Sequence, residues 1–300
     1  MSNLLFTYLK KRFPLSSKIP VIFILNITLY GGAGINENEI IYSNSAVFGF
    51  FTIFFVFFHL RLFDDLKDYS KDINAQILTK KQLLYLAFLT ILLEIIFTLI
   101  LGLIPFIFYS IVLLYSIFMY FEFFMKEKLN KKIMIYNLSH EFIIVPIGLY
   151  IYSFYHKTYV IDEPIFLLFL ISMFSILFMF ELMRKIKSKE DPDYKKSYEN
   201  LFGRSKFIFY CALISIIIAI SISLIFYSKQ SIAPIFLQMA LLIFVMSFLI
   251  MFYKSYKIVN NKIIKIITVT YLLLTLALLD ITIILTKDVV INLVGWMTVI

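Results

Sequence analysis

Long apolar stretches repeat along this chain of 300 residues, and no other feature limits its fold as strongly. A helix needs about 20 mostly apolar residues to cross the hydrocarbon core of a bilayer. We expect membrane-spanning helices at nine stretches, which are 19–35, 43–60, 83–102, 106–125, 133–152, 165–183, 207–227, 233–253 and 264–286. Hydrophobic residues make up 61% of the chain and charged residues 16%, whereas soluble domains have roughly 45–50% and about 25%. The predicted fold class is therefore an all-α integral membrane protein, and a soluble globular domain is excluded.

The positions of the basic residues predict how these spans are oriented. Of the 28 Lys and Arg residues, 25 fall in the N-terminal segment and in alternate loops, and only Lys157, Lys229 and Lys287 fall in the others. Basic loops stay in the cytoplasm. We therefore expect a multi-pass protein of the cell (inner or plasma) membrane with a cytoplasmic N-terminus and an external C-terminus. The net charge of +9 then reflects membrane topology, so we expect the lipid bilayer as a partner and no nucleic acid.

The chain has no internal repeat and no Gly/Ser or Pro linker, which predicts a single membrane-embedded domain over residues 1–300. Residues 1–18 combine the apolar Leu4, Leu5, Tyr8 and Leu9 with the basic Lys10, Lys11 and Arg12, which predicts an amphipathic helix at the membrane surface. The two longest charged loops, 61–82 and 184–206, would share the cytoplasmic face, and we expect the active site there. A single cysteine, Cys211, excludes a disulfide scaffold or a thiolate metal cluster.

Four aspartates follow the second span, in the sequence DDLKDYSKD of residues 64–72. At about 100° per residue, Asp64, Asp65, Asp68 and Asp72 fall within one quadrant of a helix, and Arg61 lies on the same face. Like charges at this spacing destabilise an isolated helix, which suggests that a cation is bound. Carboxylate oxygens suit Mg²⁺, which commonly shares its ligands with substrate phosphates. The alternative is a solvated helix end whose charge nearby lysines partly offset.

The spacing (N/D)DxxDxxxD of these aspartates resembles the first aspartate motif of the UbiA superfamily of intramembrane prenyltransferases. It follows the second span, where that family carries it. The segment Arg12-Phe13-Pro14 and the stretch FELMRKIKSKED of residues 180–191 are also similar to a bacterial branch of the family. The second motif differs from the usual DxxxD, because Glu181 is its one acid and Lys185 stands at its fifth position.

This resemblance implies nine helices around a central cavity that opens to the cytoplasmic side. It implies that Asp64, Asp65, Asp68, Asp72 and Glu181 bind Mg²⁺ and, through it, a prenyl diphosphate. Asp65, Asp68 and Glu181 would be catalytic. The side chains that would bind the substrate are Arg61, Lys126, Arg184, Lys185, His140 and Tyr198.

The implied function is Mg²⁺-dependent transfer of an isoprenoid group from a prenyl diphosphate to an unidentified acceptor. Two alternatives stay open. The altered second motif is compatible with a membrane terpene cyclase of the same fold, in which the prenyl cation reacts with its own double bond. A transporter or a lipid-binding protein could also use intramembrane acids. The sequence leaves the prenyl chain length, the number of metal ions and the oligomeric state open.

Two ionisable residues are expected to be structural. Glu94 falls in the middle of the third span, where a charge is costly unless it is paired. His59, one turn before the aspartates, is expected to be a satisfied histidine near the membrane surface.

Overall fold

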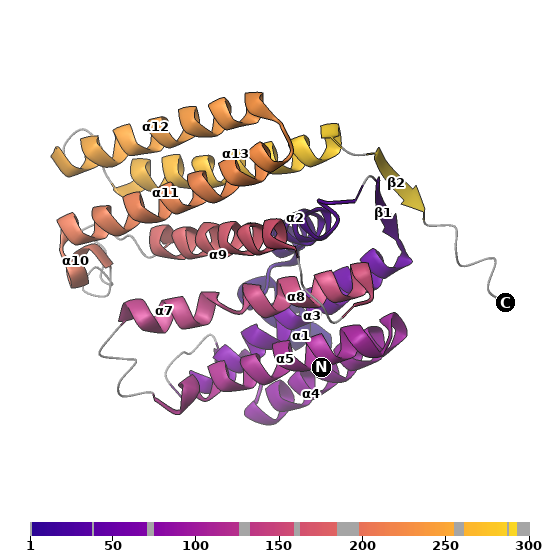
Figure 1. Ribbon diagram of the computed structural model, residues 1–300. Coiled ribbons are helices and arrows are strands. Elements are labelled where there is room, and N and C mark those ends of the chain that lie inside the picture. Colours follow the sequence, from indigo (N-terminus) through magenta and orange to yellow (C-terminus); the bar gives the residue numbers. More distant parts are fainter. Residues whose placement is uncertain are drawn as a thin grey trace. The chain divides into compact units, whose positions relative to one another are not determined.

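The computed structural model describes residues 2–37, 39–70, 75–125, 133–158, 163–184, 198–254, 261–286 and 288–292. Nearly all of these residues are helical (Figure 1). The α-helices are α1 (Ser2–Arg12), α2 (Leu15–Ala33), α3 (Asn44–Lys67), α4 (Lys80–Leu101), α5 (Leu103–Tyr120), α7 (Ile133–Glu141), α8 (Ile144–His156), α9 (Pro164–Arg184), α10 (Tyr198–Phe202), α11 (Arg204–Ser228), α12 (Ile232–Lys254) and α13 (Asn261–Thr286). Two short 3-10 turns, η1 (Ala75–Ile77) and η2 (Glu122–Phe124), lie beside α4 and α5 in the sequence.

Eight helices in the described part of the chain are long and apolar enough to cross a membrane. The apolar part of α2, Lys18–Ala33, is shorter. Each of the nine predicted spans coincides with one of these segments, and the span at 133–152 corresponds to α7 and α8 together. The predicted all-α membrane fold is confirmed, and the chain is a multi-pass membrane protein.

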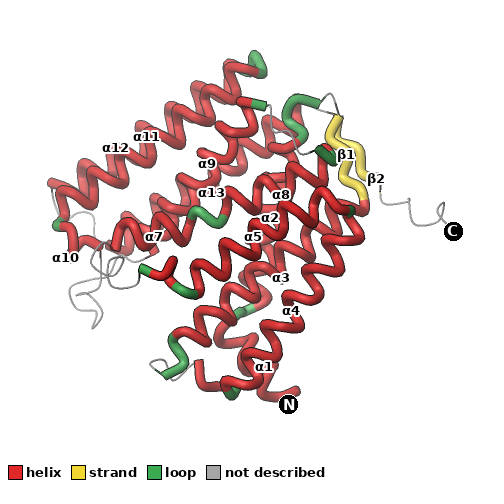
Figure 2. Tube along the Cα trace, turned by 60° about the horizontal axis from the view of Figure 1, so that its bottom comes forward, coloured by secondary structure: helices red, strands yellow, loops and turns green. Residues whose placement is uncertain are grey.

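The chain forms two compact units, which we describe separately. The first comprises residues 1–136, 145–161 and 287–300, and the second comprises 137–144 and 162–286. In the first unit, α3 packs against α2 and α4, and α5 packs against α4 (Figure 2). In the second, α11 packs against α9 and α12, and α12 packs against α13. The lone cysteine, Cys211, is buried in α11.

A small parallel sheet departs from the all-helical expectation. Strand β1 (Glu39–Ser43) pairs with β2 (Asp288–Asn292), with Glu39 opposite Asp288 and Ser43 opposite Asn292 (Figure 2). The all-α fold class is unchanged by this short pairing, which sequence reasoning missed because β2 is contributed from almost 250 residues further along the chain. No local hydrophobic pattern indicates a pairing at that distance.

Local sequence signals explain the α4–α5 hairpin. Thr79 caps α4: its side chain accepts a hydrogen bond from Gln82 N, and the Gln82 side chain accepts one from Thr79 N. The helix ends at Gly102, whose φ of +119° is available to glycine at little cost. Helix α5 begins at the next residue, with Pro105 in its first turn.

Another glycine allows close helix packing in the first unit. Gly49 of α3 faces the ring of Phe154 on α8, and a β-carbon at this position would overlap that ring. The ring of Phe154 in turn packs against Tyr30 and Tyr150, at centroid distances of 5.7 and 5.2 Å. Aromatic packing therefore fixes α3 against α8 on the membrane-embedded side of the aspartates.

Candidate functional site

Of the predicted aspartates, Asp64 and Asp65 lie in the last turn of α3 and Asp68 follows directly after it, all in the first unit. The Asp68 N–H donates to the Asp64 carbonyl at 2.9 Å, so the helical hydrogen bonding reaches Asp68. The loop expected at 61–82 therefore begins after α3 ends at Lys67, because Leu62 and Leu66 continue the buried stripe of that helix. Asp72 lies outside the described residues.

Asp65 is completely buried and accepts several strong hydrogen bonds. Tyr8 Oη donates to Asp65 Oδ2 at 2.6 Å. Arg12 donates through Nε, 3.1 Å from each carboxylate oxygen, and through Nη2 to Oδ1. Arg61 Nη2 lies 3.0 Å from the same Oδ1. The predicted substrate ligand Arg61 is thus brought to the aspartates, where it neutralises Asp65.

Burial, reinforced by the hydrogen bond to Asp65, raises the pKa of the Tyr8 hydroxyl well above its ordinary value. Tyr8 therefore stays protonated at physiological pH and remains a donor. Helix α1 is amphipathic, and the side chain of Tyr8 on its buried face is completely buried. The buried face of α1 is thus directed at the carboxylate of α3.

Asp64 and Asp68 differ from Asp65, because both are exposed. They are separated by one helical turn, about 40° in angle and about 6 Å in rise. Two carboxylates so placed present oxygen atoms of the kind that Mg²⁺ prefers. These residues therefore fit a divalent cation in donor chemistry and in access from the solvent.

Lys67 forms a second polar cluster on the other side of Asp64. Its Nζ lies 3.7 Å from Asp64 Oδ1, 3.8 Å from Glu122 Oε1 and 3.2 Å from Tyr136 Oη. All four residues belong to the first unit. Glu122 is buried, and this contact brings a cation to its carboxylate. The sequence gives little indication of such a cluster, because Glu122 and Tyr136 lie 55 or more residues from Lys67.

The backbone around Glu122 adopts a conformation that L-residues rarely take. Glu122, Phe123 and Phe124 have φ values of 50°, 51° and 56°. Such values cost of order 1–3 kcal/mol per residue and persist only where the surroundings enforce them. This turn directs Glu122 back towards the end of α3. No glycine marks the turn in the sequence, so sequence reasoning missed it.

A third polar network lies within the membrane-spanning part of the first unit. His59 Nδ1 is 2.7 Å from Glu94 Oε1, and Tyr109 Oη donates to Glu94 Oε2 at 2.8 Å. His59 and Glu94 are completely buried. The expectation that Glu94 pairs with a buried polar group is confirmed. His59 is paired through Nδ1 as expected and is buried among the helices, while its expected position near the membrane surface stays a prediction.

The remaining predicted site residues fall in the second unit or outside the described residues. Glu181 is buried near the end of α9, Tyr198 is buried in α10 and stacks on Phe202, and His140 is half-buried in α7. Arg184 is the last residue of α9. Lys126 and Lys185 lie outside the described residues. The structure therefore assembles the α3 aspartates and Arg61, while the roles of these other residues stay predictions.

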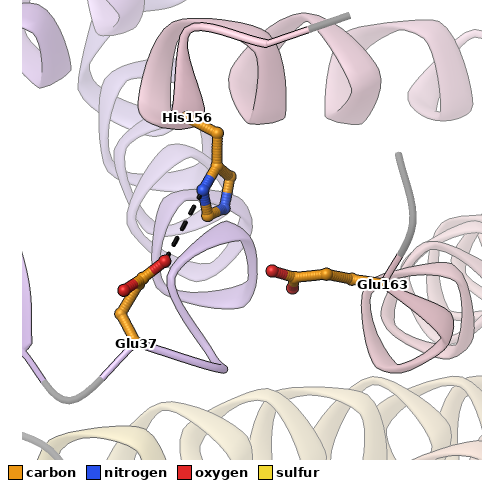
Figure 3. A group of neighbouring side chains, drawn as sticks. All are labelled: Glu37, His156 and Glu163. Carbon is orange, nitrogen blue, oxygen red and sulfur yellow. Dashed lines mark ion pairs between the residues drawn. The ribbon is translucent and has the colours of Figure 1, made fainter. Parts of the chain in front are cut away.

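An ion pair lies at the opposite end of α2 from α1. His156 Nδ1 on α8 is 3.7 Å from Glu37 Oε1, and His156 Nε2 is 2.7 Å from the Ala33 carbonyl oxygen (Figure 3). The imidazole thus caps the C-terminus of α2, where a positive charge is favoured. Glu163, also drawn in Figure 3, precedes α9 in the second unit.

Comparison with known proteins gives the fold. No protein-family model and no curated protein matches the sequence. A solved structure described as digeranylgeranylglyceryl phosphate synthase in membranes has a TM-score of 0.63 and 16% identity, over 95% of this chain and 98% of that one. A UbiA homolog from Archaeoglobus fulgidus, bound to Cd²⁺, has a TM-score of 0.52 and 11% identity, over 91% and 99%. With nearly complete coverage of both structures, this chain has the UbiA fold.

Proposed function

We propose that the protein is a membrane prenyltransferase that uses Mg²⁺ to transfer an isoprenoid group from a prenyl diphosphate to an acceptor. The observation that carries this proposal is the pair of exposed carboxylates, Asp64 and Asp68, one turn apart at the end of an apolar helix of the UbiA fold. A prenyl diphosphate has the matching chemistry, because its chain is soluble in the bilayer and its diphosphate is not.

The reaction breaks the bond between the prenyl carbon and the diphosphate oxygen, which keeps the electron pair. The acceptor then bonds to that carbon and loses a proton. A bound divalent cation would neutralise the charge that develops on the departing oxygen. Asp64 and Asp68 would hold this cation together with Asp72, which follows four residues after Asp68 in the sequence.

The two similar structures support the proposal in different ways. One is of a synthase of a digeranylgeranyl lipid, which is an isoprenoid product, and the other holds a divalent cation. We extend both features to this chain because its fold and its exposed carboxylates are compatible with them.

The residues of the second motif have proposed roles of their own. We propose Glu181 as a further metal-side acid, and Arg184 and Lys185 as direct diphosphate ligands, since Arg offers a bidentate fork and Lys a point charge. Further substrate contacts are assigned in the same way to Lys126, His140 and Tyr198.

The proposal is tested by incubating purified protein with Mg²⁺ and radiolabelled prenyl diphosphates of several chain lengths in the presence of native lipids. We expect a labelled, prenylated lipid from the wild type and none from Asp68→Asn. Glu37→Gln makes the same kind of change at an exposed acid next to α2 and should leave the product unchanged. A cyclic hydrocarbon formed without acceptor would indicate a terpene cyclase instead. Normal turnover by Asp68→Asn would refute the role of the aspartates.

A further inference from the structure

The aspartates of α3 do not share one environment, and this division has a functional consequence. We infer that Asp65 is a positioning residue, which fastens the N-terminal helix α1 to the end of α3, and that Asp64 and Asp68 are the described carboxylates left for the metal. The inference rests on the proposed function and assigns separate tasks within its site.

The hydrogen-bond geometry around Asp65 carries the first step. Each of its two oxygens already accepts a bond from Arg12, and Tyr8 and Arg61 add one contact each. A carboxylate offers about four lone-pair positions, so these donors occupy nearly all of them. Because Asp65 is also fully buried, a cation could reach it only by displacing α1.

The chain next to Arg12 strengthens this attachment. The ring of Phe13 packs between Phe54 and Phe58 of α3, at centroid distances of 5.7 and 5.1 Å. Pro14 then directly precedes α2. The three residues Arg12-Phe13-Pro14 thus give a charged contact, an aromatic contact and a helix start. They hold α1 and the beginning of α2 against a single face of α3.

The helical geometry explains how aspartates close together on one helix can have two different tasks. Asp65 is turned about 100° from Asp64 and about 60° from Asp68. That rotation places Asp65 under α1 and leaves Asp64 and Asp68 exposed. The anchor neutralises the middle carboxylate, which lowers the repulsion between like charges on the helix. It also fixes the rotation of the helix end, and therefore the direction in which the metal-binding pair points.

Helix α1 is suited to transmit such a contact. Its buried Tyr8 faces Asp65, while Phe6 is 70% exposed. An apolar side chain exposed on a short basic helix favours the membrane interface. The anchor would hold the metal-binding pair in a constant position relative to this interfacial helix.

The test compares Asp65→Asn with Asp64→Asn and Asp68→Asn, with Glu37→Gln as the matched control. Binding of Mn²⁺, used as a spectroscopic substitute for Mg²⁺, is measured by electron paramagnetic resonance without substrate. Amide hydrogen exchange of residues 2–12 and prenyl transfer are measured on the same full-length samples. The double variant Arg12→Gln/Asp65→Asn removes both charges of the anchor together.

We expect Asp65→Asn to accelerate exchange in α1 by about 100-fold or more, the factor that corresponds to breaking a buried ion pair. Its Mn²⁺ affinity should stay within about threefold of wild type while turnover falls. Asp64→Asn and Asp68→Asn should instead weaken Mn²⁺ binding by at least the roughly 10-fold seen when even a supporting residue of a metal site is lost. Exchange in α1 should be unchanged in both. The double variant should recover part of the α1 protection and part of the turnover, because the Arg12 charge is no longer left unpaired against α3.

Equal loss of Mn²⁺ affinity in Asp65→Asn and Asp68→Asn would overturn the inference, because Asp65 would then be a ligand. Unchanged exchange in α1 of Asp65→Asn would overturn it as well. If the wild type bound no Mn²⁺ and formed no product, the proposed function would fail and so would the assignment of Asp64 and Asp68. The exchange measurement would still decide whether Asp65 anchors α1.

Discussion

Replacing Glu94 by Leu should destabilise the protein more than any other single change in the buried His59–Glu94–Tyr109 network. Glu94 accepts from both neighbours, at 2.7 and 2.8 Å, and is completely buried. The variant Glu94→Leu therefore leaves two polar groups without their acceptor inside the bundle. Leu has a similar volume, so the loss reports on the polar contacts rather than on a cavity.

The magnitude follows from the two kinds of contact. Leaving one buried donor without its acceptor costs about 1–3 kcal/mol, and Glu94→Leu does this to two donors. A single hydrogen bond between membrane helices contributes about 0.6 kcal/mol on average and at most about 1.7. We therefore expect Glu94→Leu to lower the free energy of unfolding by about 2–6 kcal/mol and Tyr109→Phe to lower it by about 0.6–1.7 kcal/mol.

The assay is reversible unfolding by a denaturing detergent, followed by circular dichroism. The double variant His59→Leu/Glu94→Leu provides the decisive comparison, because replacing both partners of a buried polar contact by apolar residues can be nearly neutral. It should be more stable than Glu94→Leu alone. If Glu94→Leu cost no more than Tyr109→Phe, or if the double variant were the least stable, the reasoning about this pair would be wrong.

Three further changes test other parts of the structure. Gly49→Ala should lower the free energy of unfolding by about 1–3 kcal/mol through overpacking, and adding Phe154→Leu should restore part of this loss. A Gly49→Ala protein as stable as the wild type would contradict the close packing. Thr79→Ala should cost about 0.5–2 kcal/mol and speed amide exchange in the first turn of α4, and an unchanged exchange rate would speak against the cap. In a cysteine-free chain, single cysteines at Asn38 and Ser188 should be labelled from opposite sides of the membrane, and labelling from the same side would refute the orientation that the basic loops predict.

The sequence predicts the helices well because their signal is local. Length and apolarity alone place every span, since the bilayer requires each one to be continuous. The aspartates of α3 are found in the same way, because a fixed rotation per residue brings Asp64 and Asp68 to one side of a helix. The end of that helix is harder to predict from the sequence. Leu62 and Leu66 keep α3 helical beyond the point where the charged sequence suggests a loop.

Contacts between distant residues are beyond such reasoning. Tyr8 and Arg12 are 57 and 53 residues from Asp65, and no periodicity relates them. The motif therefore indicates four equivalent acids, whereas the described part of the structure has one buried, hydrogen-bonded aspartate and an exposed pair. The turn at Glu122–Phe124 is unpredictable for another reason, since its positive φ values occur without glycine and are imposed by the surrounding structure.

The most direct test of the central claim is the release of inorganic diphosphate from a prenyl diphosphate as Mg²⁺ is titrated. We predict Mg²⁺-dependent release by the wild type and by Glu37→Gln. Asp68→Asn should need far more Mg²⁺ or release none, although its detergent stability should match that of the wild type. Release that is independent of Mg²⁺, or equal in Asp68→Asn and wild type, would contradict the assignment of the α3 carboxylates to a metal-dependent prenyl transfer.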